Sequence, residues 1–338
     1  MVVFFTINLL VGVLAPKIIQ RQIQNNLKLE TRLGKVSLSL PFTIILEKLE
    51  IGDLASFKKI SLSPNPVALL FGKIVVHGLT IIEPVINLER SPEGKFNLPA
   101  FGQKGRSPAI YLTSLNLRDG KINFKDKKVA IGGFQVSLDK LNIKVAKVIL
   151  PLTSLATNFD LSGQVLSRQN KPCGEVVLSG RLDYLAKDLD AVLEIRNLDA
   201  TKFSVYYGNF ISKRKLSSAK LDLVSTLKSR NNALHIATKF NLSNLVYAED
   251  QPEEVDLDFT KNALDLFTDS KGNLSLEFDI DTLLDRPALS RKKIRNLILK
   301  MAAKNLAQQS PQELVSKVSA IIDQYSGKDK GLKSLLGQ

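Results

Sequence analysis

Alternating apolar and polar residues limit how this chain can fold more than any other feature, and residues 110–126 show the pattern most clearly. Their sequence, IYLTSLNLRDGKINFKD, places apolar residues at alternate positions on both sides of Asp119-Gly120. This period is typical of a strand with one apolar and one polar face. Because Asp-Gly favours a two-residue turn, the stretch predicts a β-hairpin with two apolar cross-strand pairs, Leu117 with Ile122 and Leu115 with Phe124.

Similar strand-like stretches recur through the body of the chain, and only short helical ones interrupt them, at Pro66 and at residues 201–210. Few helices of crossover length separate the strands, so a mainly antiparallel sheet is expected. Roughly 16 strands at a spacing of ~4.8 Å would make one sheet about 75 Å wide. A second sheet, closure into a barrel, or an open trough that holds lipid chains would each cover its apolar face.

Composition supports a folded chain with a sizeable core. Of the 338 residues 44% are hydrophobic and only 7% are aromatic, so the apolar content is mostly Leu, Ile and Val. The length of the chain allows one large or two ordinary domains. Cys173 is the only cysteine. A single cysteine excludes an intramolecular disulfide and a multi-cysteine metal site.

The charge balance favours an anionic partner. Lys and Arg number 47 against 33 Asp and Glu, a net charge of +14. Nucleic acid and an anionic lipid surface both attract such a chain. The basic residues are spread along polar strand faces and no nucleic-acid-binding motif accompanies them. We therefore expect no nucleic-acid partner, although a cationic nucleic-acid binder stays as a third hypothesis.

The N-terminal residues 1–16 predict a membrane anchor. Six apolar residues form its centre: Val3, Phe4, Phe5, Ile7, Leu9 and Leu10. The run is shorter than the roughly 20 residues that a bilayer requires, and basic residues follow it instead of preceding it, which would place the following side in the cytoplasm. Either the true start lies upstream, or the segment is a buried core element.

Two further helical regions flank the predicted sheet. Residues 17–30 have apolar residues at helical spacing, which predicts an amphipathic helix that leaves the membrane or caps the end of the sheet. Residues 284–325 predict amphipathic C-terminal helices, one with a capping box at Ser310. Residues 326–338 predict a flexible tail.

Nothing in the sequence indicates catalysis. His77 and His235 lie in strand-like stretches without a ligand pattern, and no phosphate-binding glycine loop is present. Three nearby carboxylates, Asp279, Asp281 and Asp285, are a weak signal for glycoside hydrolysis. We expect no enzyme, and assign no catalytic residue, metal or cofactor.

Three stretches in order resemble the AsmA-like family of bacterial envelope proteins, which includes TamB-like and YhdP-like members. They are LTIIEPVINLERSPEGKFNLP (79–99), the predicted hairpin with its Asp119-Gly120 turn, and LDLFTDSKGNLSLEFDIDTLLDRPALS (264–290). NLDATKFSVYYGNF (197–210) is similar to the linker helix of the family. Thr282 departs from the family, which often has a glycine there.

The resemblance implies an AsmA-like β-groove domain over residues 31–283, which is a mainly β fold with a long curled antiparallel sheet, an open trough, an N-terminal membrane helix and C-terminal amphipathic helices. It also implies a single-pass protein of the bacterial inner membrane whose bulk lies in the periplasm.

The implied function is phospholipid transport and outer-membrane homeostasis, with phospholipid acyl chains, the inner membrane and other envelope proteins or a second copy as partners. A non-transporting scaffold for envelope assembly is the alternative. The candidates for the groove lining are Val85, Ile86, Leu88, Leu115, Leu117, Ile122 and Phe124.

Overall fold

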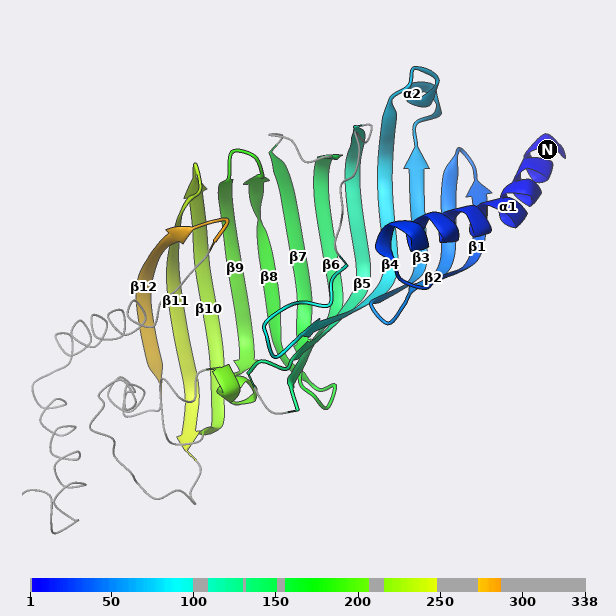
Figure 1. Cartoon of the computed structure of the whole chain (residues 1–338). Coiled ribbons are helices and arrows are strands. Elements are labelled where there is room, and N and C mark those ends of the chain that lie inside the picture. The colour runs from blue at the N-terminus through cyan, green and yellow to red at the C-terminus, as the bar shows by residue number, and fades with distance from the viewer. Residues whose placement is uncertain are drawn as a thin grey trace, which may run out of the picture.

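One sheet of twelve strands forms the body of the protein (Figure 1). The computed structural model describes residues 2–99, 109–129, 132–150, 156–206, 216–247 and 273–286. The strands follow one another across the sheet in chain order: β1 (Thr31–Ser39), β2 (Thr43–Ile51), β3 (Ala55–Pro64), β4 (Ile74–Arg90), β5 (Ile110–Asp126), β6 (Phe134–Leu150), β7 (Thr157–Leu166), β8 (Pro172–Asp183), β9 (Asp188–Asp199), β10 (Leu216–Arg230), β11 (Ala233–Tyr247) and β12 (Leu274–Leu283).

The expected mainly β fold is confirmed. Neighbouring strands pair antiparallel, apart from β4 and β5, which are parallel. The strands are fewer and longer than expected because several predicted short strands are parts of one: β4, β5 and β6 each have 17 residues. Figure 1 shows the strands side by side in one gently curved layer. At a spacing of ~4.8 Å, twelve strands span about 50 Å.

The predicted hairpin at Asp119-Gly120 is wrong. β5 continues through both residues, and Leu117 pairs with Ile81 of β4 and Ile143 of β6 instead of with a residue of its own stretch. A long strand that is paired on both sides forms many more hydrogen bonds than an isolated hairpin, which is marginally stable by itself. The wider sheet therefore determines the conformation of this stretch.

A line of distorted backbone crosses β4, β5 and β6 where the turn was expected, and we name it the crease. Glu83 in β4, Asp119 in β5 and Lys140 in β6 have left-handed backbones, with φ angles of 47°, 51° and 49°. The strand register shifts beside the last two, as in a β-bulge. The Asp119 amide donates to the side-chain oxygen of Asn142 at 3.3 Å. Asp119 thus adopts the backbone that a turn requires without reversing the chain.

Gly120 is required at the crease by close packing. A Cβ atom at this position would lie 2.6 Å from Cδ2 of Leu117 and 3.1 Å from Cγ of Pro84. Pro84 is fully buried. The Asp-Gly pair therefore serves the packing of two long strands, and the contact also shows that Leu117, Gly120 and Pro84 face the same side of the sheet.

Helix α1 (Val2–Leu27) lies along the outer edge of β1 and continues through Pro16. The side chain of Asn8 donates to the carbonyl of Leu38 at 2.9 Å and accepts from its amide at 3.0 Å. The helix therefore protects an edge strand whose backbone would otherwise be open. The two segments that the sequence analysis separates, residues 1–16 and 17–30, belong to one continuous helix as far as Leu27.

No helix in the described part of the chain combines the length and the apolarity needed to cross a bilayer. Of the predicted anchor residues, Leu9 is exposed to solvent; the side chains of Val3, Phe4, Phe5, Ile7 and Leu10 lie outside what the structure describes.

Two short helices occur where the sequence predicts them. Helix α2 (Pro66–Leu70) connects β3 to β4 and begins with Pro66 after the N-cap Asn65, whose side chain accepts from the Ala68 amide. The 3-10 helix η1 (Ala200–Phe203) follows β9. The helices predicted in residues 284–325 and the tail at 326–338 lie, beyond residue 286, outside the described residues. The end of the sheet that carries α2 and the β1–β2 turn is named the α2 end. The opposite end, which carries η1, is named the η1 end.

Candidate functional site: an apolar face across twelve strands

One face of the sheet carries a row of side chains that crosses every strand through directly paired residues. We call it the central row. Its members, from β1 to β12, are Val36, Leu46, Ile60, Ile81, Leu117, Ile143, Leu161, Leu178, Leu193, Ser225, Thr238 and Phe278. The hydroxyls of Ser225 and Thr238 are buried and hydrogen-bond to each other at 2.9 Å, so neither hydroxyl has to be solvated by water.

A second row lies two residues nearer the α2 end on the same face, because residues i and i+2 of a strand point to the same side. We call it the α2-side row. Its members are Leu38, Ile44, Leu62, Leu79, Leu115, Val145, Phe159, Gly180, Ala191, Leu227, Ile236 and Ile280. Every member is apolar or glycine, so the apolar face has no polar interruption here.

A third row, the η1-side row, extends the face beyond the crease. It comprises Thr31, Ile51, Ala55, Ile86, Ile122, Leu138, Val165 and Gly174 in β1–β8, then Leu198, Leu221, Leu242 and Leu274 in β9–β12. Gly174 joins the two parts, since a Cβ there would lie 2.9 Å from Cα of Leu198. Val165 follows Leu161 by four residues in β7, which places this row on the same face.

The central and α2-side rows of this apolar face are only half-buried, whereas most of the η1-side row is buried. In the central row Val36, Ser225 and Thr238 are buried, and the other members keep intermediate exposure. In the α2-side row only Ala191 is buried. The described strands form one sheet, with no second sheet against the apolar face. Side chains in a β-sandwich core would be largely buried, so this face has room for a further apolar layer.

The opposite face is mostly polar. The paired positions next to the central row are Ser37, Ile45, Ser61, Thr80, Asn116, Lys144, Asp160, Ser179, Val192, Thr226, Ala237 and Asp279. Several basic residues, among them Lys59, Lys121 and Lys144, lie on this side. The sheet therefore separates one apolar face from one hydrated face.

The structure brings most of the candidate lining residues together and separates one. Leu115 and Leu117 lie in the α2-side and central rows, and Ile86 and Ile122 pair in the η1-side row. Leu88 and Phe124 pair on the same face, nearer the η1 end. Val85 lies on the opposite face, beside Lys121. Sequence reasoning chose Val85 from its apolarity, but it adjoins Ile86 in one strand, and neighbouring residues point to opposite sides.

Residues 200–206, which follow β9 and which we name the strap, cover the apolar face at the η1 end. Phe203 of η1 packs against the buried cluster of Val165, Cys173 and Leu198, on β7, β8 and β9. The strap then reaches toward β5 and β6, where Phe134 meets Tyr206 edge-on with ring centroids 5.1 Å apart. Figure 1 shows η1 at this end of β9. The strap closes part of the face with side chains of the protein itself.

A buried polar cluster fixes the far side of the strap. The carboxylate of Asp126 is 1% exposed, accepts from the Tyr206 hydroxyl at 3.0 Å and from the Lys128 amide at 2.9 Å, and pairs with Arg90 at 3.3 Å. Burial opposes its ionisation, but these donors and the Arg90 charge hold the pKa of Asp126 below its ordinary value. Burial and Asp126 raise the pKa of Tyr206 to about 12, so its proton stays in place at neutral pH.

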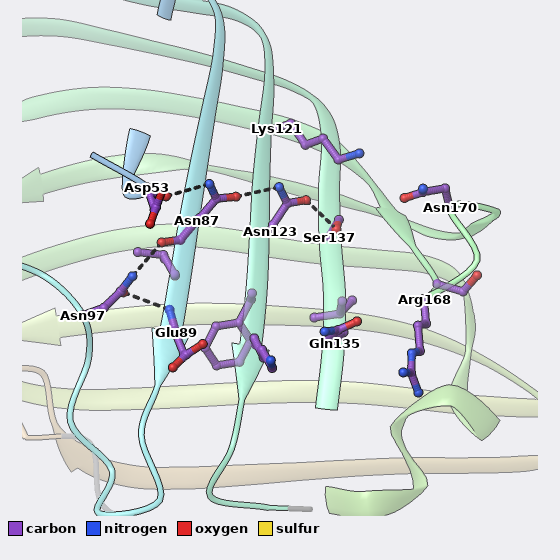
Figure 2. A pocket seen from close by; sticks show the side chains of 15 residues that line it. Asp53, Asn87, Glu89, Asn97, Lys121, Asn123, Gln135, Ser137, Arg168 and Asn170 are labelled. Carbon is purple, nitrogen blue, oxygen red and sulfur yellow. Dashed lines mark hydrogen bonds between the residues drawn. The ribbon is translucent and has the colours of Figure 1, made fainter. Parts of the chain in front are cut away.

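A polar hollow of about 530 Å³ lies over β4, β5 and β6 (Figure 2). A ladder of side chains crosses it: Asn87 donates to the Asp53 carbonyl at 2.8 Å, Asn123 donates to Asn87 at 2.9 Å, and Ser137 donates to Asn123 at 2.8 Å. These amide groups are already bonded to one another. The hydrogen bonds across the hollow therefore connect the parallel pair β4–β5 to the neighbouring chain on both sides.

The described residues contain no group of three or more side chains suited to hold a metal ion. His235 lies on the polar face, with its Nδ1 atom 2.9 Å from the Asp281 carboxylate, and Asp285 pairs with Lys187 at 2.7 Å. Cys173 is buried, and burial raises the pKa of its thiol, which disfavours the reactive thiolate.

The sequence did not reveal the buried polar cluster around Asp126, nor that the three rows run continuously across the sheet. Alternation within each strand was visible, but the register that aligns twelve strands depends on the bulges, which resemble turns in the sequence. Asp126 and Tyr206 are 80 residues apart, and no local pattern connects them. Comparison with protein-family models, with curated proteins and with solved structures gives no match for this chain.

Proposed function

We propose that this protein binds lipids, with acyl chains lying against the apolar face of the sheet. The observation that carries the proposal is the pair of rows, central and α2-side, which cross all twelve strands and remain half-exposed. Exposed apolar surface costs ~25 cal/mol per Å² in water, and each buried CH₂ group of a bound chain contributes about 0.8 kcal/mol. An acyl chain on this face removes water from both partners.

Continuity of the rows supports transfer in addition to binding. A chain that moves from one strand to the next along the central row always leaves one apolar contact for another. The rows extend about 50 Å at ~4.8 Å per strand, which is more than the thickness of a bilayer core. Curling of the sheet into a trough would wrap the acyl chain further.

The resemblance to AsmA-like proteins supports the setting of this activity. We place the protein at the bacterial inner membrane, with the sheet in the periplasm and a role in phospholipid transport and outer-membrane homeostasis. Helix α1 has four exposed apolar side chains, Leu9, Val13, Leu14 and Ile18. These residues suit contact with a membrane, which supports an N-terminal association with lipid.

Photocrosslinking at neighbouring positions tests the proposal. A photoreactive residue at Leu117 or Phe124 faces the apolar side, whereas one at Asn116 or Lys125 occupies the adjacent position on the polar side. In the full chain expressed in bacteria, we expect phospholipid adducts at the first two positions and none at the second two. Mass spectrometry of the isolated adducts identifies the lipid class.

Equal labelling of both faces would indicate non-specific contact with membranes and would contradict the proposal. Absence of lipid adducts at all four positions, together with lipid-free purified protein, would favour the non-transporting scaffold. The adjacent positions share the same strand and the same local stability, so the comparison isolates the face of the sheet as the variable.

A further inference from the structure

Resting on the proposed function, we propose that the α2 end of the sheet inserts into the surface of a lipid bilayer and so supplies the rows with acyl chains. The surface consists of the β1–β2 turn (residues 40–42) and the segment of α2 with its following residue (66–71). These two tips are named here the apolar tips. Both lie at the same end of the sheet, and Figure 1 shows α2 projecting beyond the ends of β3 and β4.

The apolar tips expose large side chains to an unusual degree. Leu40 and Phe42 are 70% and 61% exposed, and Leu70 and Phe71 are 84% and 77% exposed. Val67 and Leu69 are exposed beside them. Single exposed leucines are ordinary, but a group of large apolar residues gathered at one end indicates a surface that meets another apolar phase.

Both tips are held in shape. The Asn65 amide donates to the Val75 carbonyl at 2.8 Å, and the amides of Phe71 and Lys73 donate to Ala68 at 3.1 and 3.0 Å. Thr43 and Ser63, at the bases of the two tips, share a hydrogen bond of 3.0 Å between their hydroxyls. The apolar side chains are thus displayed on ordered backbone, which lowers the entropy cost of insertion.

The charges favour a lipid surface as the occupant. Residues 40–43 and 65–73 contain no acidic residue, and Lys73 is their only charged residue. The chain as a whole carries a net charge of +14, which attracts it to anionic lipid headgroups.

The position of the tips connects the membrane to the rows. Leu38 and Ile44 flank the β1–β2 turn, and Leu62 and Leu79 flank α2; all four are the first members of the α2-side row. An acyl chain that the tips displace from the bilayer toward the sheet would meet the α2-side row first. Asn8 bonds to Leu38, so the exposed Leu9 of α1 lies at the same end.

A tryptophan scan of the full chain measures insertion directly, because the protein has no tryptophan of its own. Phe71→Trp is mixed with vesicles of phosphatidylcholine and phosphatidylglycerol whose acyl chains carry bromine. We expect a blue shift and strong quenching. The control is Leu98→Trp, which is 52% exposed at the opposite end of the sheet and should show neither. An unquenched Trp at position 71 would overturn the proposal.

Vesicle flotation then tests the contribution of the tips to affinity. We expect the combined variant Leu40→Ser, Phe42→Ser, Leu70→Ser, Phe71→Ser to bind vesicles at least about tenfold more weakly, equivalent to about 1.4 kcal/mol. A matched control, Leu98→Ser with Val246→Ser, changes two half-exposed residues at the η1 end and should bind within about twofold of the wild type. Undiminished binding of the tip variant, or a change in oligomeric state without vesicles, would contradict the proposal.

Photocrosslinking at Leu117 separates this proposal from the lipid-binding function on which it rests. With lipid supplied from detergent micelles, the tip variant should form the same adduct as the wild type, since micelles deliver lipid without a bilayer. Loss of the adduct in both proteins would refute the lipid-binding function itself. If the apolar tips insert into the bilayer, the tip variant should lose vesicle binding and keep the lipid adduct at position 117.

Discussion

Among the carboxylates that the structure describes, Asp126 is the buried one, with 1% of its side chain exposed. It is buried at the η1 end of β5, and its partners come from β4, from the chain just after β5 and from the strap. A buried carboxylate is stable only when its charge is paired and its oxygens accept hydrogen bonds. Asp126 therefore connects the strap to the sheet, and its removal tests how firmly the strap is held.

The variant Asp126→Asn should lower the free energy of unfolding by about 2 kcal/mol, because it leaves Arg90 without its counter-charge in a partly buried site. Arg90 is 31% exposed, so solvent screens part of the loss. Urea unfolding followed by circular dichroism measures the change. The control Glu277→Gln removes an exposed pair with Lys239 and should cost less than about 1 kcal/mol. Equal costs would show that Asp126 does not fix the strap.

The same carboxylate should make stability depend on pH. The pKa of Asp126 is held below its ordinary value of 3.8, so its stabilising effect is present above that value and is lost as the pH falls through the folded-state pKa. The difference in unfolding free energy between wild type and Asp126→Asn should therefore be largest near about pH 6 and shrink below about pH 3. A difference that stays constant over this range would contradict the assigned ion pair.

At the scale of elements, helix α1 protects the edge of the sheet that β1 forms. The β1 edge is covered by α1, where Asn8 takes the place of a neighbouring strand by bonding both the amide and the carbonyl of Leu38. An edge strand that is left open can pair with other chains. The helix thus acts as a cover for β1, whichever other role its exposed side has.

The variant Asn8→Ala should loosen this cover, since two hydrogen bonds are lost and the backbone of Leu38 becomes open to water. We expect faster amide exchange in residues 36–39 and a stability loss of about 1–2 kcal/mol. Hydrogen exchange with mass spectrometry measures the first. Asn25→Ala, at an exposed position of the same helix, provides the control and should leave exchange in β1 unchanged. Protection of β1 that survives Asn8→Ala would mean that other contacts hold the helix.

The elements also show which features a sequence reveals. Period-two alternation predicted strands and a mainly antiparallel sheet, and Pro66 after Asn65 predicted α2, because both signals are local. Asp119-Gly120 misled because a left-handed residue serves a bulge as well as a turn. Glu83 in β4 has a similar left-handed backbone, beside Pro84, without ending its strand. Only the partners on either side determine which form is adopted, and those partners are distant in sequence.

For the candidate site, the apolarity of six lining residues could be read from the sequence, but their shared face does not follow from alternation alone. Leu117 and Ile122 are five residues apart in β5 and share a face because of the bulge at Asp119-Gly120. The face as a whole does not follow either, because it depends on matching registers at eleven strand interfaces of the sheet. The side chain of Val85 illustrates the limit: one position along β4 exchanges the apolar face for the polar one. The strap was equally hidden, since Phe203 contacts strands that precede it by dozens of residues.

At the scale of the whole molecule, the rows raise the question of whether the sheet is one track or a set of separate binding sites. β7 lies near the middle of the sheet, and Leu161 is its member of the central row. A charge placed there would cost several kcal/mol to cover with an acyl chain, because an ionised carboxylate loses its hydration. The half-buried position lets the charged side chain reach water, so the fold should survive the change.

The variant Leu161→Glu should therefore slow lipid transfer more than it reduces lipid binding. We expect the rate of fluorescent-phospholipid exchange between vesicles to fall at least about tenfold, which corresponds to an added barrier of about 1.4 kcal/mol, while the lipid bound per protein falls by less than half. Ser162→Glu adds the same charge to the adjacent residue on the polar face and should leave both quantities unchanged. If transfer in Leu161→Glu falls only in proportion to binding, chains do not pass β7, and the sheet holds lipids at independent sites. A disproportionate fall requires that each acyl chain cross the middle of the sheet, since a block at one strand can stop only what must pass it.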